Sequence, residues 1–239
     1  MSDHVLKTQD VAIHYGGVKA VDGVALTLER GQIRGLIGPN GAGKSTVIDA
    51  ITGRRRLTRG RVELAGEDVS ALGVVERRRR GLSRSFQRTS VFGRMPVRKQ
   101  VELASHKMGT TDSEADADEV LRELALDRLG DVIASDLGYG EQRRLDLALA
   151  LVGRPTVLLL DEPMAGLSVQ ESHDLAKHLQ ALTNRRNVSV LLVEHDMDVV
   201  FGISDEITVF ELGRVIAAGR PAEVRADPRV REAYLGSAA

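Results

Sequence analysis

The sequence contains the run Gly38-Pro39-Asn40-Gly41-Ala42-Gly43-Lys44-Ser45-Thr46, directly after the compact apolar segment Ile33 to Ile37. This run matches the phosphate-loop pattern G-x-x-x-x-G-K-[ST], and a helix is expected after it, up to about Ile51. Glycines allow backbone N–H groups to approach phosphates closely, and a helix N-terminus adds partial positive charge. The motif therefore predicts nucleotide binding, with Lys44 on the β- and γ-phosphates and the Ser45 hydroxyl on Mg²⁺.

A second apolar strand ends in two carboxylates, because Val157 to Leu160 is followed at once by Asp161 and Glu162. Ligands of parallel α/β sheets bind beyond the carboxyl ends of the strands. We expect Asp161 to hold Mg²⁺, directly or through water, and Glu162 to polarise the attacking water. An acidic pair before Pro163 could equally be an exposed turn, so this interpretation depends on the phosphate loop elsewhere in the chain.

Apolar strands alternate with helical segments through most of the chain. Residues 5–29 indicate short strands and turns, and Val24, Leu26 and Leu28 alternate as in a half-buried strand. A closing hairpin is expected around Leu212-Gly213. Alternation of strands and helices predicts an α/β fold with a parallel sheet covered on both faces.

The middle of the chain has a different pattern. Leu145, Ala148, Leu149 and Val152 recur at helical spacing, and we predict a helical insertion over residues 89–152. The acidic stretch from Thr110 to Asp118 is expected to be a loop that leads into a helix.

Composition limits the possible functions. The chain has 239 residues, a formal net charge of −1 and 3% aromatic residues, which argues against nucleic-acid binding. The basic runs Arg54–Arg56 and Arg77–Arg80 are therefore interpreted as solvated or subunit-facing surface. Absence of cysteine excludes disulfides and zinc–thiolate sites. No apolar run approaches the roughly 18–20 residues of a membrane span, so a soluble, cytoplasmic protein is expected.

Further motifs occur in a fixed order around the phosphate loop and the acidic strand. Residues Ser85-Phe86-Gln87-Arg88 and Leu137-Gly138-Tyr139-Gly140-Glu141-Gln142-Arg143-Arg144 lie between them, and Ala165-Gly166-Leu167-Ser168 and Val193-Glu194-His195-Asp196 follow. In this order and spacing the chain resembles the nucleotide-binding subunit of an ABC transporter over about its whole length. The resemblance implies a P-loop NTPase (RecA-like) ABC ATPase core with an antiparallel β subdomain and a helical insertion.

The resemblance also implies a domain division and an activity. It predicts one ABC ATPase domain over residues 4–236, with the catalytic core and β subdomain in 4–88 and 153–236 and a helical subdomain in 89–152. The expected activity is hydrolysis of ATP, with Mg²⁺ as cofactor, coupled to transport through a separate membrane permease.

Several residues acquire a role only through this resemblance. Tyr15 would stack on adenine, although a tyrosine of the core is an alternative at this position. Gln87 would contact Mg²⁺ or the attacking water and sense the γ-phosphate. His195 would contact the γ-phosphate and orient Glu162.

The segment Leu137 to Arg144, called here the signature segment, would complete the ATP site of a second cassette. Gly138, Gly140 and Glu141 are its expected nucleotide-binding residues. A helix is expected over residues 141–152, so that Gly140 precedes it and the helix N-terminus faces the phosphates. The implied assembly is an ATP-dependent head-to-tail dimer with an identical or paralogous cassette. Two positions depart from the family pattern: Gly138 stands where serine is usual, and Ser168 where aspartate is usual.

The C-terminal half is similar to one branch of the family. The runs that carry this similarity are Glu194-His195-Asp196-Met197, Gly202-Ile203-Ser204-Asp205, Ile216-Ala217-Ala218-Gly219 and Pro228 to Gly236. They resemble the ATPases of branched-chain amino-acid importers, which implies a place on the inner face of the cell membrane and, indirectly, an external substrate-binding protein. Lipopolysaccharide-export ATPases share much of the pattern, and a soluble non-transport ABC protein is a third alternative. The sequence does not identify the transported molecule.

Overall fold

Every residue of three neighbouring strands is buried in the computed structural model, which describes residues 4–85 and 90–235. These strands lie in a six-stranded sheet of order β10-β9-β3-β8-β7-β6, in which only the β9–β10 pair is antiparallel. A parallel sheet buried on both faces reads as continuous apolar runs, and the predicted α/β class is confirmed. The strands are β3 (Ile33–Ile37), β6 (Leu82–Ser85), β7 (Val157–Asp161), β8 (Ser189–Val193), β9 (Glu206–Glu211) and β10 (Arg214–Gly219).

A second, antiparallel sheet has the order β2-β1-β4-β5. Its strands are β1 (His4–Tyr15), β2 (Val18–Glu29), β4 (Arg59–Leu64) and β5 (Glu67–Asp68). The prediction of several short strands over residues 5–29 was wrong, because β1 and β2 form one long hairpin. Irregular residues such as Asp10 and Gly23, both at positive φ, are absorbed as shifts of register within the hairpin and do not end its strands.

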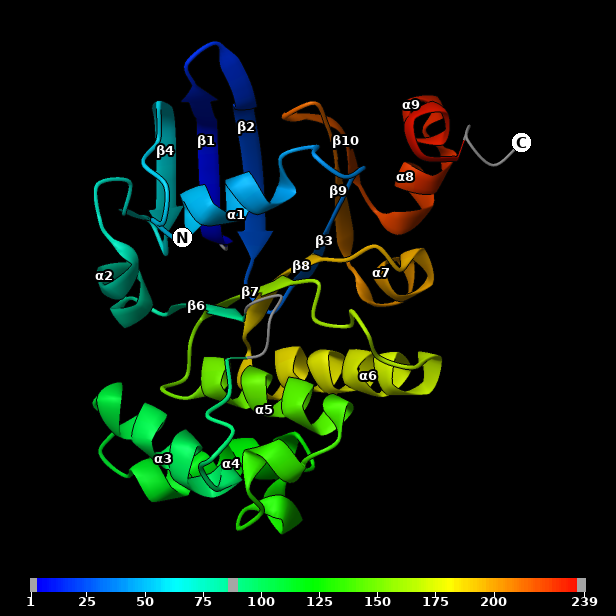
Figure 1. Cartoon of the computed structure of the whole chain (residues 1–239). Helices are drawn as coiled ribbons and strands as arrows, with labels where there is room; N and C mark the ends of the chain where they lie inside the picture. Colours follow the sequence, from blue (N-terminus) through cyan, green and yellow to red (C-terminus); the bar gives the residue numbers. More distant parts are fainter. Residues whose placement is uncertain (1–3, 86–89, 236–239) are drawn as a thin grey trace.

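The helices divide by position along the chain (Figure 1). All regular elements that the structure describes between β6 and β7 are helical. The α-helices before β9 are α1 (Lys44–Ile51), α2 (Val74–Arg79), α3 (Val97–Lys107), α4 (Ser113–Glu123), α5 (Tyr139–Leu151), α6 (Val169–Arg186) and α7 (Met197–Ile203). Short ones are the 3-10 turns Asp127–Leu129 and Ala134–Asp136, α8 (Pro221–Ala226), α9 (Pro228–Val230) and the π-helical turn Arg231–Leu235. Boundaries of subdomains within this arrangement stay a prediction.

Successive side chains of the central strands point to opposite faces of the sheet and pack into two separate cores. Leu158 and Leu160 of β7 pack with residues of α5 and α6, whereas Val157 and Leu159 pack with α1 and the antiparallel sheet. Figure 1 shows the same division, with α5 and α6 on one side of the sheet and β1, β2 and α1 on the other. The central sheet is therefore the common wall of both cores.

Two helix starts differ from the sequence prediction. Helix α4 begins at Ser113, inside the stretch 110–118 that was expected to be a loop, because Asp112 caps it by accepting a hydrogen bond from Ala115 N at 3.0 Å. Helix α5 begins at Tyr139, so Gly140 lies in its first turn and not before it. No helix among the described residues is long and apolar enough to cross a membrane.

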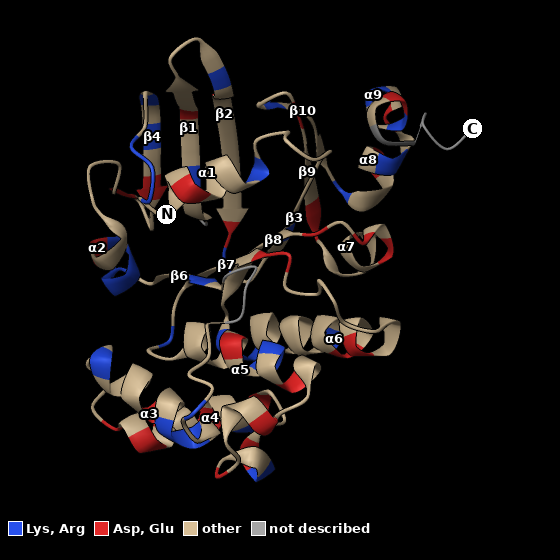
Figure 2. Cartoon of the chain, viewed as in Figure 1, with Lys and Arg blue, Asp and Glu red and all other residues tan. Residues whose placement is uncertain are grey.

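One of the two basic runs, Arg77–Arg80, is solvated only in part. Arg77 is 1% exposed, and its guanidinium donates to the carbonyls of Ala50 (2.9 Å) and Ile51 (2.6 Å). These carbonyls lie in the last turn of α1, where the i+4 helical donors run out, although Ala50 O also accepts from Gly53 N at 3.2 Å. The prediction was wrong for Arg77, which closes the C-terminus of α1 and also binds the loop carbonyls of Ser70 and Leu72. The run Arg54–Arg56 is exposed as predicted, and Figure 2 shows acidic and basic residues mixed over both sheets and the helices.

Arg77→Ala is predicted to lower the free energy of unfolding by about 2–5 kcal/mol, because several buried carbonyls lose a charged donor. Arg79→Ala is the matched control, since this arginine is exposed on the same helix and should change stability by less than about 0.5 kcal/mol. Urea denaturation followed by circular dichroism measures both. Equal unfolding midpoints for the two variants would contradict the capping role of Arg77.

Candidate functional site

The phosphate loop lies between β3 and α1, where its backbone is packed too closely for side chains. A Cβ atom on Gly38 would lie 2.3 Å from the Phe210 carbonyl oxygen, and one on Gly43 would lie 2.6 Å from that of Ala20. Gly43 also has φ +102° and is the N-cap residue of α1. Only glycine fits these positions, and the exposed residues Asn40, Gly41 and Ser45 form the open side of the loop, with Thr46 half-buried behind them.

Lys44 lies over this loop rather than in solvent. Lys44 is 6% exposed, and its Nζ donates to the carbonyl oxygens of Gly38 at 2.6 Å and Pro39 at 3.1 Å. Burial lowers the pKa of Lys44, while the charges of Glu162 and Asp161 oppose this shift. The lysine therefore brings a positive charge to the place where the loop presents its backbone.

Asp161, the last residue of β7, and Glu162, the residue after it, differ in backbone conformation. Glu162 has φ +52°, and its backbone N–H donates to Val193 O at 2.8 Å, so the chain leaves the strand abruptly at this residue. Asp161 stays in the strand, where one oxygen accepts from Arg84 Nη2 at 2.8 Å. The same guanidinium binds Asp49 of α1 at 2.5 Å. Burial raises the pKa of Asp161, and Arg84 opposes this effect.

The structure brings Glu162 and His195 together, with 2.9 Å between Oε1 and Nε2. Glu194, which sequence reasoning did not single out, lies beneath them and is 4% exposed. Its carboxylate accepts from Met164 N at 2.7 Å and His195 N at 3.1 Å, and burial raises its pKa. Glu194 thus ties the turn that carries Glu162 to the residue that contacts it. A charged residue directly after the apolar strand β8 was the available signal.

The signature segment places its three predicted residues at the start of α5. Gly138 is the N-cap with φ −62° and ψ 158°, and its N–H donates to Glu141 Oε2 at 2.9 Å. A Cβ on Gly138 would meet nothing closer than 3.6 Å, so the backbone there does not require glycine. At Gly140 a Cβ would lie 2.5 Å from Glu171 Oε1, and a side chain is excluded unless Glu171 moves.

These residues line a depression of about 360 Å³ together with Leu167 and Glu171 of the α6 start. Ser168, the second departure from the family pattern, caps α6: its Oγ accepts from Glu171 N at 3.3 Å and donates to Glu171 Oε2 at 2.7 Å. Serine and aspartate are both favoured at such a position, which accounts for the replacement. The described residues around this depression include none of the phosphate loop.

Tyr15 ends β1 and is 47% exposed, so the alternative of a core tyrosine was wrong. The Arg55 guanidinium carbon lies 5.8 Å from the centre of its ring. Gln87 lies outside the described residues. No group of three or more His, Cys, Asp or Glu side chains in the described part of the chain could hold a metal ion.

Comparison with known proteins assigns the family. Residues 21–165 match the model of the ABC transporter family, and residues 214–239 match the model described as branched-chain amino acid ATP-binding cassette transporter. The chain belongs to the ABC transporter family. It is an ATP-binding and ATP-hydrolysing subunit coupled to transport, and membership implies membrane permease partners and dimerisation.

Similar proteins extend over the full chain. The high-affinity branched-chain amino acid transport ATP-binding protein BraF of Pseudomonas aeruginosa is 38% identical, with all of both chains aligned. LivG of Escherichia coli, with the same description, is 37% identical over all of both chains. The lipopolysaccharide export system ATP-binding protein LptB of Haemophilus influenzae is 33% identical over 97% of each chain.

Solved structures agree on the fold. The ADP conformation of an ATP-binding cassette of an ABC transporter superposes with a TM-score of 0.87 at 29% identity, covering 98% of this chain and all of the other. The cassette cbiO1 from Clostridium perfringens superposes at 0.86 and 26% identity, covering 99% and 98% of the two chains. The predicted ABC ATPase fold is confirmed.

Proposed function

We propose that this chain is the ATPase of an importer for branched-chain or related amino acids, acting on the inner face of the membrane. The observation that carries the proposal is the match of residues 214–239 to the branched-chain cassette model, which lies outside the general cassette match. Full-length relatives at 37–38% identity support it, and LptB is a more distant match. An external substrate-binding protein would act on the chain only through the permease.

The proposed nucleotide site uses the loop backbone and Lys44 for the phosphates. Mg²⁺ prefers oxygen donors and is usually held by one or two carboxylates plus phosphates, a donor set that the Ser45 hydroxyl and Asp161 supply. When bound, the ion would neutralise phosphate charge. Asp161 is buried and already accepts from a cation, Arg84, so the site is built to hold positive charge beside this carboxylate. Gln87 is proposed to complete the set.

Glu162 is proposed to polarise the attacking water. Its backbone turn carries the carboxylate away from β7, and the His195 contact fixes one of its oxygens. His195 would hold Glu162 in position and contact the γ-phosphate, while Tyr15 offers an exposed ring for stacking on adenine. Each of these residues ends or closely follows a strand: Tyr15 ends β1, Glu162 follows β7 and His195 follows β8.

The start of α5 is proposed to act on the nucleotide of a second cassette. Helix α5 spans thirteen residues, and the first N–H groups of a helix have no intrahelical partner and carry partial positive charge. Gly138, Gly140 and Glu141 face a depression of their own, separate from the phosphate loop. Head-to-tail pairing of two cassettes would bring each depression to the partner's ATP.

An apolar depression of about 340 Å³ is the proposed contact for the permease. Val74 of α2 and Leu149 of α5 line it, together with Phe92, whose side chain is 60% exposed. Exposed apolar patches of this kind mark interaction sites. Residues of the core and residues of the helices between β6 and β7 both line this depression. A bound permease would therefore contact both parts and respond when one moves relative to the other.

Glu162→Gln should retain ATP binding but lower turnover by about 10²–10⁴-fold, the usual contribution of a general base. Glutamine keeps the size of the side chain and a hydrogen-bonding atom for His195. Phosphate release and ATP affinity are the two measurements, with the exposed Glu76→Gln as control. Near-normal turnover in Glu162→Gln would remove Glu162 from this role.

The proposed substrate class is tested by co-purifying the chain with its membrane subunits and binding protein. Assembled in lipid, the complex should hydrolyse ATP faster when the binding protein carries leucine, isoleucine or valine. Stimulation by lipopolysaccharide, with no response to amino acids, would favour the export alternative and contradict the proposal.

A further inference from the structure

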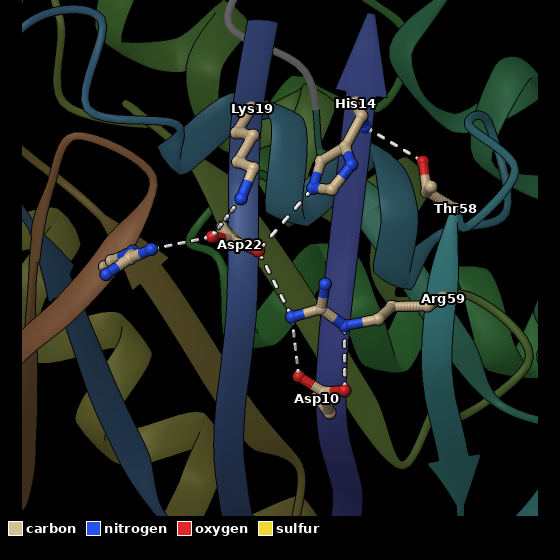
Figure 3. Close-up of polar contacts among 7 residues, drawn as sticks. Asp10, His14, Lys19, Asp22, Thr58 and Arg59 are labelled. Carbon is tan, nitrogen blue, oxygen red and sulfur yellow. Dashed lines mark hydrogen bonds and ion pairs between the residues drawn. The ribbon is translucent and has the colours of Figure 1, made fainter. Parts of the chain in front are cut away.

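The carboxylate of Asp22 lies at a junction of four strands. It accepts from Arg214 of β10 at 2.8 Å and from Arg59 of β4 at 3.1 Å, and Lys19 of β2 and His14 of β1 lie at 3.5 Å. Figure 3 shows His14, Lys19 and Arg59 converging on this side chain. The Asp22 side chain is 8% exposed, whereas the side chains of its partners Arg59, Lys19 and Arg214 are 47%, 59% and 65% exposed.

This junction connects directly to the phosphate loop. The backbone N–H of Asp22 donates to Gly213 O at 2.9 Å, and Gly213 N donates to Ala42 O at 2.9 Å. Arg214, whose side chain reaches Asp22, follows Gly213 in the chain. Gly213 is also packed tightly, since a Cβ there would lie 2.7 Å from Ala20 O. The β9–β10 turn is therefore held between Asp22 and the loop.

On its other side the junction connects to Tyr15. His14, the residue before it, points its imidazole toward Asp22, and its backbone N–H donates to Thr58 Oγ1 at 2.9 Å (Figure 3). Thr58 precedes Arg59, the second arginine on Asp22. The end of β1 is thus fixed through contacts that converge on one carboxylate.

Asp22 remains ionised under all physiological conditions, because hydrogen bonding to Arg214 above all lowers its pKa to about 2. The neighbouring carboxylate of Asp10 differs from that of Asp22 in its exposure and in its ion-pair partners. Asp10 also pairs with Arg59, at 2.8 Å, but its side chain is 63% exposed and its described ion pairs do not include Arg214. The two carboxylates therefore share one arginine, while only Asp22 reaches the turn against the phosphate loop.

We propose that Asp22 is a positioning residue for nucleotide binding, which sets the Tyr15 end of the β1–β2 hairpin at a fixed distance from the phosphate loop. This inference rests on the proposed roles of Tyr15 and the loop. Nucleotide binding costs less conformational freedom when the Tyr15 ring and the phosphate loop already lie in their binding positions. Asp22 itself touches no part of the nucleotide in this account.

The test compares two ligands that share phosphates but not adenine. Affinities for ADP and for inorganic pyrophosphate, both with Mg²⁺, are measured by calorimetry, since neither ligand is hydrolysed by the site. Asp22→Asn and Arg214→Gln should each weaken ADP binding by about 3–10-fold, which is a part of the affinity that stacking on a base provides. Pyrophosphate binding should change by less than twofold, and Asp10→Asn should leave both ligands unaffected.

Tyr15→Ala completes the experiment. It should weaken the binding of ADP but not of pyrophosphate. Adding Asp22→Asn to it should have no further effect on ADP affinity, because the two residues act on the same interaction. Thermal melting of each variant is recorded alongside. Should Asp22→Asn prove unstable, Arg214→Gln with Tyr15→Ala supplies the same comparison.

The inference would be overturned by a lower melting temperature with an unchanged ratio of ADP to pyrophosphate affinity, by equal weakening of the binding of both ligands, or by full additivity with Tyr15→Ala. An effect of Asp10→Asn equal to that of Asp22→Asn would also overturn it. If Tyr15→Ala alone leaves ADP affinity unchanged, the proposed role of Tyr15 fails first, and this variant identifies that failure separately.

Discussion

The close approach of the phosphate-loop backbone to two other strands is the constraint on which the rest of the structure depends. Gly38 leaves no room for a side chain against Phe210 of β9, and Gly43 leaves none against Ala20 of β2. The loop is thereby held between the parallel and the antiparallel sheet, and a hydrogen bond from Gly213 to Ala42 closes it. The antiparallel sheet is therefore part of the proposed nucleotide site, since it packs against the loop and carries Tyr15.

The register between β7 and β8 determines where the acidic residues and His195 of the proposed site lie. Asp161 pairs with Val193 across β7 and β8, so the residues that follow, Glu162 and Glu194, leave the sheet at the same level. This brings His195 to Glu162, and the buried carboxylate of Glu194 binds both turns through backbone N–H groups. Three shielded carboxylates have the same role, since those of Asp161, Glu194 and Asp22 each hold neighbouring elements together.

What could be predicted from the sequence was local. The phosphate loop, the apolar strands before the acidic residues and the helical middle all depend on neighbours within a few residues, and the structure shows these elements. The burial of Arg77 could not be predicted, since its partners are carbonyls of α1. Likewise, nothing near Asp22 indicates a pair with Arg214, 192 positions away. The first turn of α5 was misplaced because Gly138 and Gly140 disfavour helix by propensity, although a local hydrogen bond from Gly138 N to Glu141 closes its start.

The proposal that two cassettes share each ATP site rests on the signature segment, which opens into a depression of its own, apart from the phosphate loop. ATP turnover per molecule, measured across a range of protein concentrations with sedimentation in parallel, tests this most directly. Turnover should rise with concentration as ATP-bound dimers form from a mostly monomeric protein. Constant turnover in a protein that sediments as a monomer throughout would contradict the shared site.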